Sequence, residues 1–485
     1  MMKLSSNSLN HMSSTNLIKK NVLIIISGNG YVRNYMTTDA FSEIEKDFHC
    51  SYLVSDKVND LSAFRAKVLL GKYAIEAAME LRHYQIFSIL MWKYRAKSSS
   101  FYFRAMRARR LHFTFSKDDN FIKKVLKATW RIFRYAGRFA VDFIRYNNLI
   151  FPFYINWYKN TLKINAGLEE KIRTSMPSII LFPSSAYDPD GIDIVRICKR
   201  IGIPVLFLID NWDNLSSKSI LWEKPSHVAV WGEQSAEHAV NIQGFKKDQV
   251  TSIGTPRFDE YFKVRDTDLK SYFNFKYILF VGTALAFDEA DVLQRLNDIM
   301  LQHPDIFYSV KIIYRPHPWR QGHDSIIGKD LDNVIIDPQI INAYTAMDSM
   351  NFQPDLSYYP SLLKNAEFVI GGLTSMIIEA LIFRKRFVAL AYDDGKNFTS
   401  QHNALKYYKH FQGLKEVKAI SFCEKIDELE EVFISAWLSR NNIDAKKIDS
   451  QRRYFYFDDG RKYSKRLRNL CFKITDQSLK DNVTI

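Results

Sequence analysis

Cysteine is scarce in this sequence, and its placement excludes a disulfide framework. The 485 residues include four cysteines, which lie far apart and form no C-x-x-C pair. The eleven histidines show no HExxH motif, and the two acids of "YDPDG" at 187–191 have no EF-hand continuation. These absences predict a protein of the reducing cytoplasm that holds no metal ion and needs no cofactor besides its substrates.

Long hydrophobic runs are absent as well. No stretch approaches the roughly 18 consecutive apolar residues that a membrane-spanning helix requires. The run "VLIII" at 22–26 has only the length of a strand, and the first twenty residues lack the apolar core of a signal peptide. We therefore expect residues 1–20 to form a flexible tail. The protein is expected to be soluble or to lie on a membrane surface rather than to cross it.

The apolar residues that are present fall into short runs separated by helical patterns. Hydrophobic residues make up 47% of the chain and aromatic residues 14%, which indicates a folded protein. Apolar runs that alternate with helical patterns predict parallel, doubly wound sheets. Strands are expected at 21–27, 50–55, 178–183, 204–209, 227–232 and 250–254, and then at 277–282, 310–315, 333–337, 367–372 and 387–391.

A polar segment around 263–274 interrupts this alternation and divides the chain into two Rossmann-like halves. We expect an N-terminal domain over 21–265, with a basic helical insertion at about 60–175, and a C-terminal domain over 275–440. Residues 441–485 are expected to form a C-terminal helical tail. The predicted class is α/β, with two domains that face each other across a cleft.

Small and basic residues follow two predicted strands of the second half. One strand ends in "RPHP" at 315–318, where two prolines stop the strand and hold Arg315 and His317 in one shape. A rigid corner would explain this turn without any function. Open α/β sheets, however, bind their ligands at the carboxyl ends of the strands, where Arg315 and His317 could contact a phosphate. Gly282 and Thr283 form a second small-residue turn directly after a strand.

The third turn of this kind reads "GGLTSMIIEAL", at 371–381. Thr374 and Ser375 are placed to cap a helix start, where backbone donors and the positive helix end favour a phosphate. Glu379 lies one turn later on the same face as Ser375 and could accept hydrogen bonds from a ribose diol. A cap followed by a helical Glu is often only structural. Three such turns in one half of the chain nevertheless favour a nucleotide site.

These segments resemble a known group of enzymes. "RPHP" followed by "YYPSLLKNAEFVIGGLTSMIIEAL" resembles the nucleotide half of GT-B glycosyltransferases that build bacterial surface polysaccharides, and of the related CDP-glycerol glycerophosphotransferases. The latter usually have an Asp and a pair of serines where this chain has "GGLTSM". The segment "VTSIGTPRFDEYF" at 250–262 is similar to the loop that closes the first domain in these proteins and in UDP-GlcNAc 2-epimerases. The similarity covers roughly residues 178–395.

The resemblance implies a GT-B fold and assigns roles to residues of this chain. His317, Ser375 and Glu379 would bind the nucleotide-sugar donor, with Arg315 and Thr374 beside them. In such enzymes the first domain holds the acceptor, whose hydroxyl needs a base to take its proton in an inverting transfer.

Two carboxylates of the first half are the best candidates for that base by their positions. Asp39 could instead cap the helix that it begins, and Asp213 could only brace its turn. Trp212, in the same loop as Asp213, could stack on a sugar or be buried. The sequence leaves open whether transfer inverts or retains configuration.

The insertion contains a two-faced basic helix. At ~100° per residue, residues 122–145 place apolar side chains on one face and cations on the other. The cations of the outer face include Lys123, Lys127, Arg131, Arg134 and Arg138. A solvated surface helix would explain the pattern. The functional alternative is docking on anionic phospholipid at the cytoplasmic membrane face, whereas no nucleic-acid-binding module is recognisable.

Taken together, the sequence predicts a glycosyltransferase that works without a metal. It would move a sugar from a nucleotide-sugar to a cell-surface glycan or lipid-linked acceptor at the inner face of the membrane. His317 and Arg315 would stabilise the phosphate of the departing nucleotide. A polyol-phosphate transferase or 2-epimerase-like enzyme on the same fold stays open, as does a non-catalytic scaffold that binds glycan or membrane, because fold does not fix function.

Overall fold

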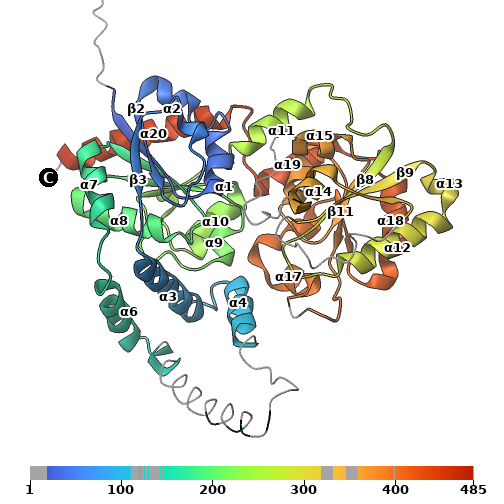
Figure 1. Cartoon of the computed structure of the whole chain (residues 1–485), viewed down its shortest axis with the longest axis horizontal. Helices are drawn as coiled ribbons and strands as arrows, with labels where there is room; N and C mark the ends of the chain where they lie inside the picture. Colours follow the sequence, from blue (N-terminus) through green and yellow to red (C-terminus); the bar gives the residue numbers. More distant parts are fainter. Residues whose placement is uncertain are drawn as a thin grey trace, which may run out of the picture.

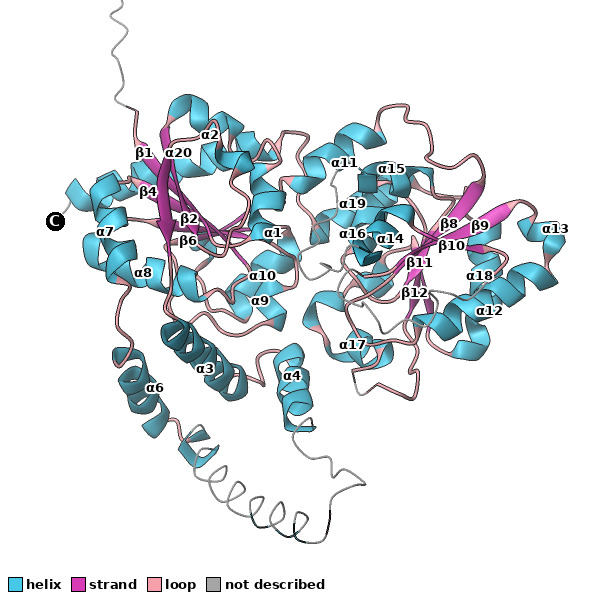
Figure 2. Ribbon diagram, viewed as in Figure 1, coloured by secondary structure: helices cyan, strands magenta, loops and turns pink. Residues whose placement is uncertain are grey.

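Two parallel sheets form the centres of two domains (Figures 1 and 2). The computed structural model describes residues 19–110, 120, 122, 125, 129, 142–144, 146–317, 331–345, 358–397 and 399–483. The strands of the first sheet are β1 Asn21–Ile26, β2 His49–Ser55, β3 Leu69–Tyr73, β4 Ile179–Ser184, β5 Val205–Ile209, β6 His227–Val230 and β7 Val250–Ser252. Those of the second are β8 Lys276–Val281, β9 Val310–Arg315, β10 Val334–Ile336, β11 Val369–Gly371, β12 Phe387–Leu390 and β13 Ile420–Cys423.

The order of the strands is that of doubly wound sheets. Within the described residues the first sheet has the order β3-β2-β1-β4-β5-β6-β7 and the second the order β10-β9-β8-β11-β12-β13. All of their pairings are parallel. β4 and β5 are buried at every residue, as expected where helices cover both faces of a parallel sheet. The predicted α/β class is confirmed.

Two strands, both at sheet edges, were not predicted from the sequence. β3, with the sequence "LLGKY", exposes three of its five residues, and β13 has only four residues. An edge strand needs no continuous apolar run, since one side of it meets solvent or loops. All eleven predicted strands are present, with bounds that differ by at most two residues.

Helices flank both sheets. Their bounds in the first domain are α1 Asn29–Tyr31, α2 Ser42–Asp47, α3 Ala77–Lys93, α4 Ser99–Arg110, α6 Ile150–Asn160, α7 Ala166–Ser175, α8 Pro189–Ile201, α9 Asn214–Ser217 and α10 Glu233–Asn241. Those that follow are α11 Arg257–Arg265, α12 Glu289–Gln302, α13 Pro304–Phe307, α14 Pro338–Thr345, α15 Tyr358–Asn365, α16 Met376–Ile382, α17 Gln401–Tyr407, α18 Leu429–Leu438, α19 Ala445–Phe455 and α20 Tyr463–Val483.

The C-terminal helix α20 returns to the first domain, where it packs beside α2 and against β4 (Figure 1). Its buried side chains Tyr463, Leu467 and Leu470 join the core formed by β1 and α2. Lys20, directly before β1, pairs with Asp476 at 2.6 Å. The tail therefore completes the N-terminal domain, a position that the sequence did not indicate.

The insertion between β3 and β4 extends from one side of the first domain (Figure 1). Its described helices are α3, α4, α6 and α7. The predicted membrane-binding residues Lys123, Lys127, Arg131, Arg134 and Arg138 lie outside the described residues. Among the helices that the structure describes, none is long and apolar enough to cross a membrane.

Helix α4 of the insertion connects the two domains. Ser98 and Arg104 donate hydrogen bonds to carbonyls at the end of α9 in the first domain. On its other side the ring of Phe103 stacks on Tyr407 of α17 with a centroid distance of 4.3 Å. The insertion therefore bridges the domains on one side of their interface.

Candidate functional site

The "RPHP" turn after β9 is fixed within the C-terminal domain. Arg315 is buried and pairs with Asp337, which follows β10. Its guanidinium also donates to Gln339 Oε1 at 2.7 Å and lies 3.9 Å from the ring centroid of Tyr359. Half-buried His317 follows at the same strand end. The arginine therefore holds the turn that presents the histidine.

The turn after β8 packs directly on the turn that carries His317. A Cβ atom added to Gly282 would come within 2.6 Å of the His317 backbone nitrogen and 2.9 Å of the Pro316 Cα. Only glycine permits this approach. Thr283 is buried, and its hydroxyl donates to the carbonyl of Leu373 at 2.9 Å. Gly282 and Thr283 therefore join the ends of β8, β9 and β11 into one surface.

Helix α16 begins at that surface. Thr374 and Ser375 are half-buried at its start, and Thr374 Oγ1 accepts from the backbone N–H of Met376 at 3.5 Å. Ser375 occupies the N-cap position, but its side chain makes no capping hydrogen bond. Ser375 thus has the predicted N-cap position, but the side-chain bond at this helix start, from the Met376 N–H to Thr374 Oγ1, is long.

Glu379 points from α16 toward helix α11. Its Oε2 accepts a hydrogen bond from the hydroxyl of Tyr261 at 2.7 Å, and its Oε1 lies 3.6 Å from Arg257 Nη2. Burial raises the pKa of Glu379, whereas the positive charges of Arg257, Arg33 and Arg315 act in the opposite direction. Arg257 is therefore the guanidinium that lies beside this buried carboxylate, and the charges of Arg33 and Arg315 also act on it.

Arg33 contributes to this cluster from the first domain. It lies in a π-helical turn, Val32–Met36, that follows β1. Its Nε donates to Asn34 Oδ1 at 2.9 Å, and Asn34 donates to Asp210, at the end of β5, at 2.8 Å. Burial lowers the pKa of Arg33, and the charge of Arg257 lowers it further. The two arginines therefore repel each other in the same buried region.

Like Arg33, Arg257 was not predicted from the sequence to belong to the site. It begins α11, and its Nε and Nη2 atoms are buried without a hydrogen-bond partner among the described residues. The guanidinium lies 5.0 Å from the ring centroid of Trp231. A buried guanidinium with unused N–H groups is suited to an anionic ligand. The only local signal for it in the sequence is "TPRF", within the segment 250–262 that carries the resemblance.

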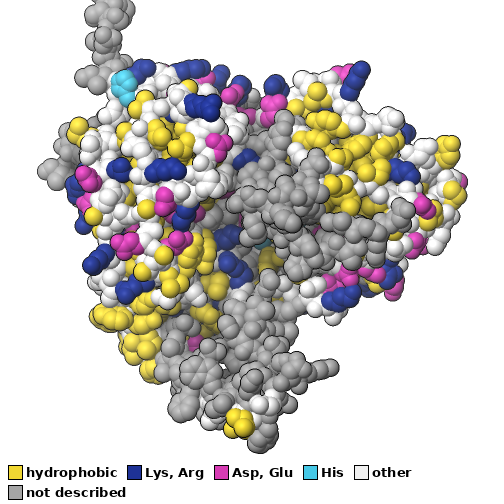
Figure 3. Space-filling view, in the orientation of Figure 1, with side chains coloured by type: hydrophobic (Ala, Val, Ile, Leu, Met, Phe, Trp, Pro, Cys, Tyr) yellow, Lys and Arg dark blue, Asp and Glu magenta, His cyan; other side chains and the backbone are white. Residues whose placement is uncertain are grey.

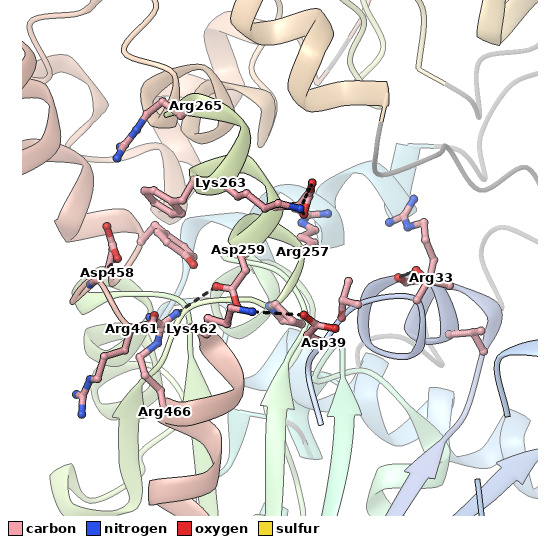
Figure 4. A pocket seen from close by; sticks show the side chains of 18 of the residues that line it. Arg33, Asp39, Arg257, Asp259, Lys263, Arg265, Asp458, Arg461, Lys462 and Arg466 are labelled. Atoms are coloured by element: carbon pink, nitrogen blue, oxygen red, sulfur yellow. Dashed lines mark hydrogen bonds and ion pairs between the residues drawn. The ribbon is translucent and has the colours of Figure 1, made fainter. Parts of the chain in front are cut away.

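A cavity of about 1060 Å³ adjoins the arginines (Figure 4). It is lined by three stretches of chain, at 29–60, 256–266 and 456–466, and both Arg33 and Arg257 belong to its wall. Asp39 also lines it; its side chain is 73% exposed and lies 3.6 Å from Lys462 Nζ. This carboxylate is therefore accessible from the cavity.

Asp213 lies elsewhere, at the start of α9. It occupies the N-cap position without a side-chain capping bond, and its Oδ2 accepts from Ser217 Oγ, at the other end of the helix, at 2.6 Å. Burial raises the pKa of Asp213, but Lys218 and the Ser217 hydroxyl outweigh this effect and hold it below its ordinary value. The facing His410, from the other domain, has its pKa lowered to about 4 by burial. Trp212 is buried against His410 at 5.3 Å between ring centroids.

The loop after β4 holds a further set of acids. The hydroxyl of Tyr31 donates to Asp188 Oδ1 at 2.8 Å, and Asp188 Oδ2 accepts from the Ser184 hydroxyl at 2.8 Å. Asp190, two residues later, accepts from Tyr73 at 2.9 Å. Burial raises the pKa of Asp190 to about 6, near neutrality. These bonds hold the loop that the sequence places at the acceptor side.

Metal ligands do not assemble in the described part of the chain, where no group of three or more His, Cys, Asp or Glu side chains could hold an ion. The polar groups that meet between the domains are instead arginines, carboxylates and tyrosines. Such a set can bind a phosphate or a sugar through charge-assisted hydrogen bonds.

Comparison with known proteins identifies the fold. No protein-family model matches the chain, and no curated protein matches it significantly. The S. aureus MnaA–UDP co-structure is 10% identical, with a TM-score of 0.50, over 94% of this chain and 97% of that one. UDP-GlcNAc 2-epimerase from Methanocaldococcus jannaschii is 11% identical, with a TM-score of 0.48, over 93% and 99%. A glycosyltransferase from Rickettsia africae is 10% identical, with a TM-score of 0.46, over 96% and 99%.

The similarity to the MnaA–UDP structure extends over nearly the whole length of both chains, and at such low identity it concerns the fold alone. The chain has the GT-B-like arrangement of two Rossmann-like domains, which confirms the predicted fold and the resemblance on which it rested.

Proposed function

We propose that the chain is a glycosyltransferase that moves a sugar from a nucleotide-sugar donor to a glycan or lipid-linked acceptor in the cleft between its domains. The observation that carries this proposal is Arg257, whose Nε and Nη2 atoms are buried without a hydrogen-bond partner among the described residues and whose Nη2 lies 3.6 Å from Glu379 Oε1. Guanidinium groups match the geometry of phosphate oxygens, so an anionic ligand would satisfy these N–H groups. The MnaA structure, which contains UDP, supports a nucleotide as that anion.

The donor would lie against the C-terminal domain. Glu379 accepts hydrogen bonds from the ribose once Tyr261 is displaced, and Thr374 and Ser375 contact the phosphates at the start of α16. His317, presented by the turn that Arg315 holds, donates to the departing phosphate. Negative charge develops on that group during transfer, so donors fixed beside it lower the barrier.

The acceptor would enter through the cavity of the first domain. Asp39 is better placed than Asp213 to take the proton from the acceptor hydroxyl, because Asp39 lines the cavity and Asp213 already accepts from Ser217. The phosphates are met by guanidinium groups in this proposal, without a metal ion. We place the reaction at the cytoplasmic face of a membrane, where a lipid-linked acceptor would be found.

The proposal is tested by calorimetric binding of UDP, CDP, GDP and CMP to the wild type and to Glu379→Gln. We expect one preferred nucleotide, bound at least about tenfold more weakly by the variant because it loses a charged acceptor for the ribose. Glu367→Gln is the matched control, since Glu367 pairs with Arg440 at 2.7 Å in the same domain. Absence of binding by every nucleotide would refute the proposal and favour a scaffold.

A 2-epimerase is the second candidate, and the similarity of the segment "VTSIGTPRFDEYF" at 250–262 to a loop of UDP-GlcNAc 2-epimerases favours it. An epimerase would convert UDP-N-acetylglucosamine to a new sugar without any acceptor. Incubation of the wild type with the labelled nucleotide-sugar alone distinguishes the two. Release of an epimerised sugar identifies the epimerase, whereas a product that forms only after glycan is added identifies the transferase.

A further inference from the structure

Helix α6 of the insertion exposes large apolar side chains along one face. Leu149, Phe153 and Trp157 are 80%, 78% and 64% exposed. They are spaced four residues apart and therefore share one side of the helix. The opposite side packs into the domain core through Phe151 and Ile155. The helix is thus apolar on both sides, and only the inner side has a partner among the described residues.

The exposed face extends beyond the helix itself. Ile150, the first residue of α6, is 40% exposed, and Phe143 and Tyr146, which precede the helix, are 59% and 41% exposed. Leu81 of α3, also exposed, lies next to Arg82, whose guanidinium reaches Thr161 just after α6. Figure 3 shows hydrophobic side chains gathered on the surface where Figure 1 places α3 and α6. We name this row the α6 face.

Cations lie beside the α6 face. Residues 77–165 contain eighteen Lys and Arg against four Asp and Glu. Among those that the structure describes, Arg95 lies over the exposed ring of Tyr146 at 4.4 Å from its centroid, and Lys93 lies 4.8 Å from the ring centroid of buried Phe151. Positively charged side chains therefore border the exposed apolar row.

We propose that the α6 face docks on a bilayer that contains anionic phospholipid. Leu149, Phe153 and Trp157 insert at the level of the headgroups, and the neighbouring cations pair with lipid phosphates. Aromatic and aliphatic side chains bordered by Lys and Arg are the features that hold a helix in a membrane interface. The inference extends the proposed function, which provides a lipid-linked acceptor, and it concerns a surface outside the cleft.

The charge of the α6 face argues for lipid over the other partners it could meet. Two copies that met through this face would bring Arg82, Lys93 and Arg95 of each copy close together, and the repulsion disfavours self-association. A nucleic acid would satisfy the cations but offers no apolar surface for Leu149 and Phe153. An anionic bilayer satisfies both.

The test is co-sedimentation of the full chain with vesicles of phosphatidylglycerol and phosphatidylcholine in equal parts, and with vesicles of phosphatidylcholine alone. We expect binding to the anionic vesicles that is weakened at least about tenfold in Phe153→Ser/Trp157→Ser. Tyr308→Ser is the matched control, because Tyr308 is an equally exposed aromatic residue of the other domain. Circular dichroism verifies that each variant is folded.

Three outcomes would overturn the inference. One is a wild type that sediments with neither kind of vesicle, and another is a double variant that binds like the control. The third is a dimer in sedimentation velocity that the double variant abolishes while no vesicle is bound. Nucleotide affinity, measured on the same samples, is expected to stay unchanged in the double variant. Failure of docking is therefore distinguishable from failure of the proposed function.

Discussion

The hydroxyl of Tyr261 donates a 2.7 Å hydrogen bond to Oε2 of Glu379, so a side chain of α11 occupies the carboxylate that the sequence assigns to ribose. Both residues are buried, and α11 packs against α16. A nucleotide that bonds to Glu379 must therefore first displace this hydroxyl. The contact links donor binding to the position of α11.

Tyr261→Phe is expected to destabilise the protein without nucleotide and to strengthen the binding of nucleotide. Loss of the hydroxyl leaves a buried carboxylate oxygen without its donor, which costs about 1–3 kcal/mol in the free energy of unfolding. The same loss removes the competitor of the ribose, so nucleotide should raise the melting temperature more in the variant than in the wild type. Thermal unfolding with and without the preferred nucleotide measures both effects.

Tyr277→Phe serves as the control for this variant, since Tyr277 donates to the carbonyl of Leu362 at 2.7 Å in the same domain. It should lose stability without any gain in the nucleotide effect. Equal nucleotide effects in the two variants would show that Tyr261 does not compete with the ligand.

Gly282→Ala is expected to abolish transfer. The new methyl group would come within 2.6 Å of the His317 nitrogen and must push the two turns apart, which moves His317 away from the donor phosphate. Activity assays with the nucleotide-sugar test this. Gly30→Ala is the control, because a Cβ at Gly30 meets no atom within 4 Å. Full activity of Gly282→Ala would remove the "RPHP" turn from the site.

Arg257→Gln is expected to reduce kcat by about 10²–10³ if its guanidinium stabilises charge in the transition state. The substitution also relieves the repulsion of Arg33, so the folded protein should lose little stability. Steady-state kinetics and thermal unfolding separate these effects. Arg295→Gln, on the exposed side of α12, should behave like the wild type. An unchanged kcat in Arg257→Gln would exclude this arginine from the chemistry.

Asp190→Asn is expected to change how stability depends on pH. The pKa of Asp190 is about 6 in the folded protein and 3.8 ordinarily, so between these values the folded state binds a proton that the unfolded chain has lost. The contribution of Asp190 to the free energy of unfolding is therefore fully present below about pH 4. It falls by about 3 kcal/mol as the pH rises through about 6. Denaturant unfolding at pH 4 to 8 should show the wild type losing stability relative to the variant. Parallel pH profiles would contradict the raised pKa.

The fold could be predicted from the sequence because parallel strands buried on both faces appear as continuous apolar runs. The turns that follow them could be predicted as well, since glycine, proline and capping residues mark strand ends. The edge strand β3 was missed because its exposed residues leave no buried apolar run, and β13 was missed because it has only four residues.

The cluster between the domains could not be predicted, because its members have no local pattern. Arg33 and Arg257 lie 224 positions apart in the sequence, and only the approach of α11 to the first domain brings them together. The contact between Tyr261 and Glu379 could not be predicted from the sequence for the same reason. Asp39 and Asp213 were proposed as equals, and only the cavity and the Ser217 bond distinguish them.

Because α20 lies on the first domain and α11 packs on α15 and α16 of the second, the chain passes between the domains twice, once between β7 and α11 and once between α19 and α20. Two connecting segments that lie side by side allow the domains to open and close about a single axis, but they oppose free rotation of one domain against the other. Neither domain is therefore a separable module. A chain cut after α19 would keep the second sheet with its helices, yet it would strip the first domain of the helix that packs on α2 and β4.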